Sequence, residues 1–294
     1  MIGIGIGIPF DLRPLVISVF AGAAAAYSMR IPAGSAYNGP LIRVRRSTDN
    51  AEQNFGAAAV DANGSRWLDT TALLAFVGAG SGFVTTWYDQ SGNGFHATQT
   101  TAANQPTIVS SGTVVTLSGR PSILAPLAAQ WMTITTGTLL GVNGQVLPGN
   151  WVSLVGRANG AVGHSFISND MPGLYGHGLG ATTGGAISVM SNRFFSTGAA
   201  NTLPFSTLLV ASMDWSTTAG NIGNVNGTQV LTTVNDSGDG GGSSTYLFDL
   251  QPNTRGAAVP VYLSEVVIGK AARVTASRRA LERSQGAAFG ITVA

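Results

Sequence analysis

Five carboxylates are candidates for acid–base chemistry: Asp89, Asp170, Asp236, Asp239 and Glu265. Cleavage of a sugar linkage needs two such groups across one cleft, about 5 to 5.5 Å apart in retaining enzymes and farther apart in inverting ones. The whole chain has only 13 Asp and Glu residues. Hydrogen bonding within turns explains the four Asp residues, and an ion pair at a strand end explains Glu265. We therefore expect no catalytic pair.

Asp236 and Asp239 share the Gly-rich run 236–240. Closely spaced oxygen ligands on a flexible loop can surround Ca²⁺, so this run could form a ligand or metal loop. The alternative is a Gly-rich loop that holds no ion, and we favour it because no bidentate Glu lies nearby. Apart from this Ca²⁺ alternative, we expect neither a metal site nor a cofactor.

Histidine and tryptophan could also bind ligands. The three histidines lack the HxH or HxxxH spacing of a zinc site, so we interpret them as turn residues: His96, His164 and His177. Four tryptophans lie in strand-like runs, where burial in the core is more common than stacking on a sugar: Trp87, Trp131, Trp151 and Trp215.

Asp89 follows the most strand-like run of the chain, residues 83–88, in which every residue is β-branched or aromatic. After it come Ser91 and Asn93, which close local hydrogen bonds, and glycines that can adopt a positive φ. The pattern predicts a buried strand that ends in a tight, ordered turn. We expect Asp89 to accept backbone N–H groups there rather than to bind a ligand.

Three helices are predicted. Asp69 is a good N-cap for a helix over 70–77, and Gly78 is placed to end it in a left-handed conformation. An Ala-rich helix is predicted over 22–29, before a Pro that disfavours helix at the preceding residue. Apolar residues at helical spacing predict a last helix over 275–288.

The remaining segments favour strands. Residues 41–46 alternate as a half-exposed strand does, and from Pro106 to Ile268 short β-type runs alternate with turns and without helices. Asn226-Gly227 predicts a hairpin between strands at 208–215 and 228–234. Many strands without intervening helices predict a β-sandwich or barrel.

The opening residues alternate with period two, so Ile2, Ile4, Ile6 and Ile8 share one face and three glycines share the other. A Gly-rich strand is stable only when it is paired or covered. We expect an arm that adds to a neighbouring subunit, with an ordinary first strand as the alternative. The chain is therefore expected to form a homo-oligomer.

The run WYDQSGNG, followed by HATQ and NQP, resembles the N-terminal part of the catalytic domain of α-L-arabinofuranosidases and related concanavalin-A-like modules of bacterial and phage proteins. The similarity begins near residues 26–30, continues through 39–49 and ends after Arg120-Pro121. It implies a concanavalin-A-like, or laminin-G-like, jelly roll. The Val-Asn-Gly turn and the closing strand and helix resemble the C-terminal part of such modules.

The same resemblance implies a nucleophilic Glu in the central part of the domain and an acid Asp in a later Gly-rich stretch. Neither motif can be matched in this sequence, whose central segment 163–180 offers only Asp170. We therefore expect a protein that is not an enzyme.

Composition excludes several classes of function. Charged residues make up 10% of the chain and the net charge is +2, so no basic surface for nucleic acid stands out. Cysteine is absent, which excludes disulfides. No apolar run approaches the ~20 residues that span a bilayer, and we interpret residues 15–26 as a retained segment rather than a signal peptide.

These patterns predict an all-β, concanavalin-A-like jelly-roll β-sandwich with short helices and a C-terminal helix. Residues 1–21 would form the N-terminal arm and residues 22–294 the jelly roll. We expect a phage virion structural protein, either a capsid decoration or a tail or fibre component. It would be located in the virion and contact other virion proteins and a host surface glycan. The alternative is a carbohydrate-binding or arabinofuranosidase-like glycoside hydrolase module.

Overall fold

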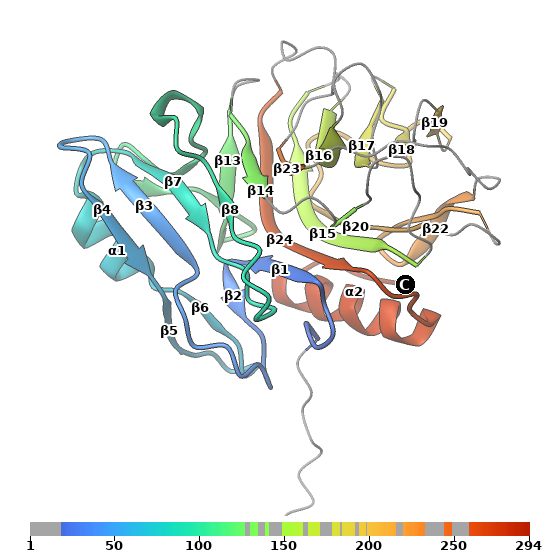
Figure 1. Cartoon of the computed structure of the whole chain (residues 1–294), viewed down its shortest axis with the longest axis horizontal. Helices are drawn as coiled ribbons and strands as arrows, with labels where there is room; N and C mark the ends of the chain where they lie inside the picture. The colour runs from blue at the N-terminus through green and yellow to red at the C-terminus, as the bar shows by residue number, and fades with distance from the viewer. Residues whose placement is uncertain are drawn as a thin grey trace, which may run out of the picture.

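The two longest strands among the described residues lie side by side in an antiparallel layer that carries the closing helix on its outer face (Figure 1). The computed structural model describes residues 19–126, 130–134, 139–140, 149–160, 164–170, 178–182, 184–191, 194–197, 199–215, 220–232, 244–248 and 259–294. In order of pairing, this layer consists of β1 (Ala25–Ser28), β24 (Val261–Gly269), β15 (Trp151–Ala158), β20 (Leu209–Asp214), β21 (Ile222–Val225) and β22 (Thr228–Thr232).

The second layer continues the same curved sheet. In order of pairing it runs through β4 (Glu52–Phe55), β3 (Ile42–Arg46), β7 (Gly82–Trp87), β8 (Ala97–Thr98), β14 (Met132–Ile134), β23 (Ser244–Leu247), β16 (His164–Asp170), β17 (Gly178–Ala181), β18 (Ile187–Ser191) and β19 (Phe194–Thr197). The two layers are joined by β9 (Thr107–Ser110) and β13 (Ile123–Ala125), and β10 (Thr113–Val114) pairs with β9.

Smaller elements flank the sandwich. A three-stranded sheet consists of β2 (Arg30–Ile31), β6 (Arg66–Leu68) and β5 (Ala57–Val60), in that order. A two-stranded sheet consists of β11 (Thr116–Leu117) and β12 (Arg120–Pro121). The helices are α1 (Thr70–Val77), a 3₁₀ turn at Ala102–Asn104 and α2 (Thr275–Phe289). No helix in the described ranges has the length and apolarity that crossing a membrane requires.

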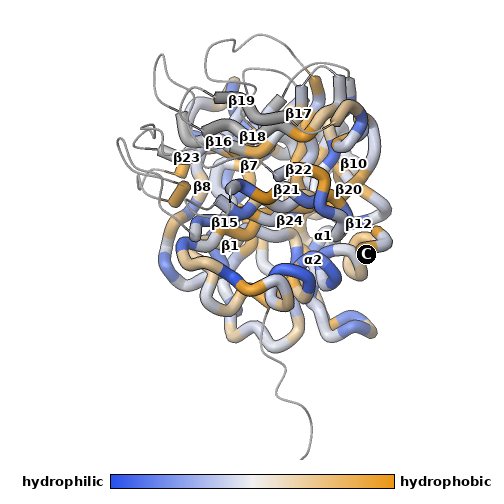
Figure 2. Tube along the Cα trace, turned by 90° about the vertical axis from the view of Figure 1, so that its right-hand side faces the viewer, coloured by the Kyte–Doolittle hydropathy of each residue, from blue (hydrophilic) through white to orange (hydrophobic). Residues whose placement is uncertain are grey.

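The core fills the space between the two layers. Leu154 on β15 and Met213 on β20 belong to the same buried cluster as Phe166 on β16 and Leu179 on β17. On the opposite face of the first layer, α2 packs through Leu281 and other buried side chains. Figure 2 shows hydrophilic positions along α2 and apolar ones in the strands of the sandwich. The predicted all-β jelly-roll sandwich with a C-terminal helix is confirmed.

Most local signals near the motif are also confirmed. The side chain of Asp69 accepts a hydrogen bond from the Ala72 N–H at 2.9 Å, as predicted for an N-cap. Gly78 ends α1 with a positive φ of +65°, but its ψ of −142° differs from the predicted left-handed conformation. The C-terminal helix ends at Phe289, one residue beyond the predicted end. Strand β3 alternates buried and half-buried residues as predicted.

Two predictions of local structure and strand pairing were wrong. Residues 25–28 form the strand β1 rather than part of a helix, because all four are buried and pair antiparallel with β24, and this pairing outweighs the helix propensity of Ala. The Asn226-Gly227 turn does form a hairpin, with φ +49° and +82°. It joins β21 to β22, however, and not the strand at 209–214, which pairs with β21 instead.

The predicted arm residues Ile2, Ile4, Ile6 and Ile8 lie outside the described residues. The described chain begins at Val19, and Phe20 is already buried against Leu281 of α2 and Val267 of β24. The division into an arm and a jelly roll stays a prediction.

Candidate functional site

Asp89 lies just after β7 and is 2% exposed. Its Oδ1 accepts hydrogen bonds from the backbone N–H groups of Ala26 and Ser91, both at 2.9 Å. Its Oδ2 accepts from the Ser91 hydroxyl at 2.8 Å and from the Phe95 N–H at 3.1 Å. The carboxylate thus connects the turn to β1, and these contacts leave it little capacity to bind a ligand.

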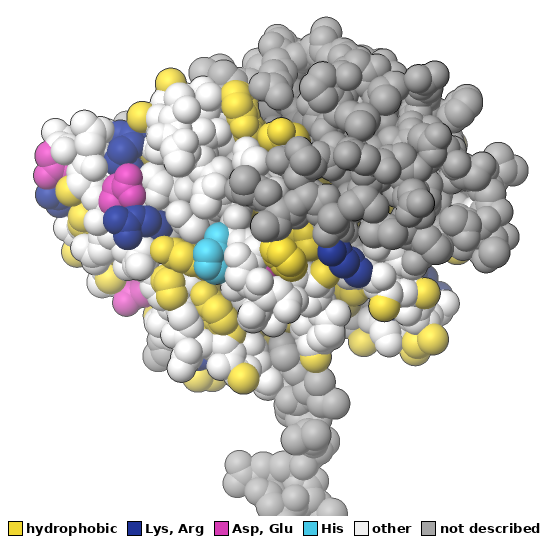
Figure 3. Space-filling model, in the orientation of Figure 1, with side chains coloured by type: hydrophobic (Ala, Val, Ile, Leu, Met, Phe, Trp, Pro, Cys, Tyr) yellow, Lys and Arg dark blue, Asp and Glu magenta, His cyan; other side chains and the backbone are white. Residues whose placement is uncertain are grey.

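The other two turn residues reach the segment that precedes β1. The Asn93 side-chain amide donates to the carbonyl oxygens of Ala23 and Ala24 at 3.2 and 2.9 Å, and the Ser91 hydroxyl lies 3.2 Å from the latter. His96 accepts a hydrogen bond from the Asp89 N–H at its Nδ1 and is exposed. Figure 3 shows histidine in cyan on the face of the molecule that it draws. Asp89, Ser91 and Asn93 of one turn therefore hold this turn against residues 23–26, more than 60 positions earlier in the chain.

Glu265 lies in the middle of β24 rather than at a strand end, and it is fully buried. It forms an ion pair with Arg30, in which Nε of Arg30 and Oε2 of Glu265 are 2.8 Å apart. The same oxygen accepts a hydrogen bond from the Ser28 hydroxyl at 2.8 Å. The predicted ion pair is confirmed, and its predicted position at a strand end was wrong.

Eight of the carboxylates have side chains that the structure describes, and each accepts a hydrogen bond from the protein. The donors are Arg46 for Asp49, Arg43 for Glu52, Trp67 for Asp61, the Ala72 N–H for Asp69, the Ala26 N–H for Asp89, Arg273 for Asp214, Arg30 for Glu265 and Arg278 for Glu282. A catalytic acid needs a carboxyl group directed at the substrate. These eight are instead directed at structural partners.

The remaining candidates are not brought together by the described residues. Asp170 is the last residue of β16, where its backbone lies opposite Ser244 of β23. Asp236 and Asp239, the predicted ligand or metal loop, lie outside the described residues, as does His177. Within the described ranges, no three His, Cys, Asp or Glu side chains are grouped as a metal site would need.

The tryptophans of the strands are mainly structural. Trp87 and Trp215 are 0% and 1% exposed, so their predicted place in the core is confirmed. Trp151 is half-buried, and its indole N–H donates to the Ala271 carbonyl at 3.0 Å. The fifth tryptophan, Trp67 on β6, lines a pocket.

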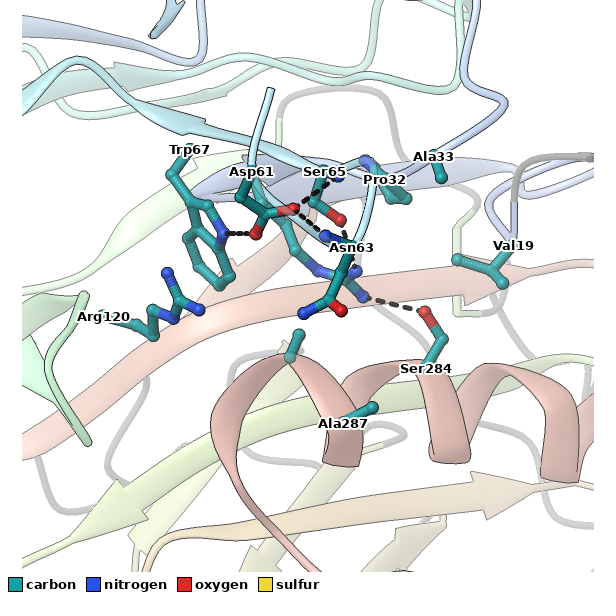
Figure 4. A pocket seen from close by; sticks show the side chains of 12 residues that line it. Val19, Pro32, Ala33, Asp61, Asn63, Ser65, Trp67, Arg120, Ser284 and Ala287 are labelled. Carbon is teal, nitrogen blue, oxygen red and sulfur yellow. Dashed lines mark hydrogen bonds between the residues drawn. The ribbon is translucent and has the colours of Figure 1, made fainter. Parts of the chain in front are cut away.

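This pocket has a volume of about 380 Å³ and lies between α2 and the three-stranded sheet β2–β6–β5 (Figure 4). We call it the α2 pocket. It is lined by Val19, Arg30, Pro32, Ala33, Asp61, Asn63, Ser65, Trp67, Arg120, Ser284, Ala287 and Ala288. Volumes of this order accommodate small-molecule ligands.

Asp61 and Trp67 form one wall of the α2 pocket. The Trp67 indole N–H donates to Oδ2 of Asp61 at 2.9 Å, and the backbone N–H groups of Asn63 and Ser65 both donate to Oδ1 at 2.9 Å. Partial burial opposes ionisation of Asp61, but these three hydrogen bonds and the charge of Arg120 outweigh it and lower the pKa. Asp61 is therefore ionised at neutral pH.

The comparisons with known proteins agree with the sandwich. The family model of the alpha-L-arabinofuranosidase B catalytic domain matches residues 18–120, which include the Asp89 turn, and this confirms the resemblance noted in the sequence. No curated protein matches the sequence.

Solved structures share the fold at low sequence identity. An α-L-arabinofuranosidase soaked with a cyclic sulfate inhibitor is 17% identical, with a TM-score of 0.70 over 91% of this chain and 63% of that one. An arabinofuranosidase complexed with arabinofuranosyl-α-1,2-xylobiose gives the same values. The binding domain of a paraclostridial mosquitocidal protein is 13% identical, with a TM-score of 0.52 over 68% of this chain and 49% of that one. The chain thus spans 63% of the length of the arabinofuranosidases that it resembles.

Proposed function

We propose that this chain is a carbohydrate-recognition module that binds α-L-arabinofuranosyl groups attached to a xylan-type chain. The observation that carries the proposal is the shared fold with an arabinofuranosidase in complex with arabinofuranosyl-α-1,2-xylobiose, at a TM-score of 0.70 over 91% of this chain. The match of the family model to residues 18–120 supports it independently from the sequence.

The carboxylates support recognition rather than cleavage. Hydrolysis needs an acid and either a base or a nucleophile that face one sugar. The eight carboxylates with described side chains are all hydrogen-bonded within the protein, Asp89 and Glu265 among them. Binding needs no such pair, because hydroxyl and amide groups can hydrogen-bond a sugar without a titrating partner.

The experiment compares retention with turnover. The full chain is run by native affinity electrophoresis in gels that contain arabinofuranosyl-substituted xylan or unsubstituted xylan, and it is incubated separately with 4-nitrophenyl α-L-arabinofuranoside. We expect retardation only by the substituted polymer and no release of 4-nitrophenol. Equal mobility in both gels would remove the support for the proposal.

Release of 4-nitrophenol would make the chain a hydrolase and would direct attention to the carboxylates whose side chains are not described. In that case Asp170→Asn, Asp236→Asn and Asp239→Asn are compared with Asp49→Asn, an exposed residue paired with Arg46. A catalytic carboxylate would be recognised by loss of turnover with retention in the gel preserved.

Nothing in these comparisons bears on the virion role predicted from the sequence. That role, with its location in the virion, its protein partners and its homo-oligomeric state, stays a prediction. The Gly-Ile alternation of residues 2–8 is its main support.

A further inference from the structure

Arg120 is the unusual residue of the α2 pocket. The carbon of its guanidinium lies 4.3 Å from the centroid of the Trp67 ring, and no described residue accepts a hydrogen bond from it. Stacking on an aromatic ring orients the guanidinium plane but leaves the N–H groups at its edge available. Arg120 therefore presents an oriented set of donors without an acceptor.

The other charged groups of the α2 pocket are already engaged. Arg30 donates to both carboxylate oxygens of Glu265, at 2.8 and 3.2 Å, and to the Ser284 hydroxyl at 3.2 Å. The carboxylate of Asp61 accepts three hydrogen bonds from N–H groups, and its negative charge interacts with the positive charge of Arg120. What Arg120 offers a ligand is therefore its N–H groups, which no described residue accepts.

Two neutral polar groups complete the donor set. The side chain of Asn63 is exposed, and its amide has no hydrogen-bond partner among the described residues. In the view of Figure 4 this amide lies between Arg120 and Ser284. An amide and a hydroxyl arranged in this way suit the hydroxyl groups of a sugar, since each can donate and accept.

The geometry of the Arg120 guanidinium and the volume of the pocket together indicate the class of ligand. A planar carboxylate fits the edge of a guanidinium through two parallel hydrogen bonds, which a neutral hydroxyl cannot match. A small carboxylate alone would leave much of about 380 Å³ unfilled, whereas a monosaccharide would also reach Asn63 and Ser284.

We propose that the α2 pocket is a binding site for a carboxylate-bearing monosaccharide, of the uronic acid type. The carboxylate lies against Arg120, and the ring hydroxyls contact Asn63 and Ser284. This site is separate from arabinofuranosyl recognition and does not depend on it.

The test is a calorimetric titration of the full chain with sodium glucuronate, and with glucose and sodium acetate as comparison ligands. We expect glucuronate to bind at least about tenfold more tightly than either of the others, because neither supplies both the carboxylate and the ring hydroxyls. Affinity for glucose or acetate equal to that for glucuronate contradicts the assignment.

Variants assign the site. Arg120→Ala is expected to weaken glucuronate binding at least about tenfold, and Arg120→Lys to restore it only in part, because a lysine keeps the charge and loses the paired geometry. Arg43→Ala is the matched control, since Arg43 lies on β3 and pairs with Glu52 away from the pocket. Unchanged binding by Arg120→Ala, with circular dichroism as the check on folding, overturns the proposal.

Retention by arabinofuranosyl-substituted xylan distinguishes the two proposals. Arg120→Ala should keep this retention while it loses glucuronate binding. Loss of both by a folded variant would contradict a separate site. If the unmodified chain binds glucuronate without being retained, the proposed function fails and the uronic acid site stands.

Discussion

Arg30 and Glu265 form an ion pair whose side chains are only 3% and 0% exposed, with Nε and Oε2 2.8 Å apart. The pair joins β2 to the middle of β24, and Arg30 extends the connection to α2 through Ser284. Two buried charges are tolerated because they hydrogen-bond each other and the neighbouring hydroxyls of Ser28 and Ser284. The pair therefore fixes how the N-terminal strands meet the closing strand and helix.

The first prediction concerns this pair. Glu265→Ala leaves Arg30 buried and unpaired, so the free energy of unfolding should fall by about 3 to 5 kcal/mol. Glu52→Ala is the matched control, because Glu52 pairs with Arg43 at the surface and should lose no more than about 1 kcal/mol. Urea unfolding followed by circular dichroism measures both. Equal losses would mean that burial of the pair does not matter.

The second prediction concerns Asp89. Asp89→Asn keeps the shape of the side chain, but it replaces one acceptor oxygen with an NH₂ group that faces N–H donors. Leaving buried donors unsatisfied costs about 1 to 3 kcal/mol each, so the loss should exceed about 2 kcal/mol. Asp69→Ala, which removes a helix cap at a half-buried position, should cost about 1 kcal/mol. If Asp89→Asn unfolded at the same urea concentration as the unmodified chain, the turn would not depend on the carboxylate.

The third prediction concerns alkaline pH. Burial first, and then the charges of Asp89 and Tyr88, raise the pKa of Tyr37 from 10.0 to about 12. Between pH 10 and 12 the hydroxyl of Tyr37 therefore keeps its proton in the folded chain but loses it in the unfolded chain. The contribution of protonated Tyr37 to the free energy of unfolding is complete below pH 10 and is lost as pH rises toward 12. The side chain is only half-buried, so solvent screening reduces the loss to about 1 kcal/mol.

Tyr37→Phe provides the comparison for that loss. The variant lacks the hydroxyl that donates to the Pro40 carbonyl at 2.5 Å, so it should be less stable than the unmodified chain at pH 9. The difference between the two free energies of unfolding should shrink between pH 10 and 12. A constant difference over this range would show that Tyr37 does not ionise later in the folded chain.

Local signals predicted the elements whose residues decide their own conformation. Asp69 and Gly78 delimit α1 because capping and a positive φ act within one turn of helix. The Asn226-Gly227 turn formed for the same reason. Residues 25–28 were misassigned because their conformation is set by pairing with β24, more than two hundred residues later, which no local pattern reports.

The α2 pocket could not be predicted in the same way. Trp67, Arg120 and Ser284 come from three distant segments, and each looks ordinary where it stands in the sequence. The one local signal in the sequence was the segment from Asp61 through Asn63 to Trp67, in which polar turn residues precede a tryptophan. Such a pattern is common in structural turns and does not indicate a ligand.

Calorimetric titration of the full chain with arabinofuranosyl-α-1,2-xylobiose and with xylobiose tests the central claim most directly. The two sugars differ only in the arabinofuranosyl group, so the difference in their affinities measures recognition of that group. We expect the substituted sugar to bind at least about tenfold more tightly, which corresponds to about 1.4 kcal/mol. Equal affinities, or no heat of binding with either sugar, would contradict the claim.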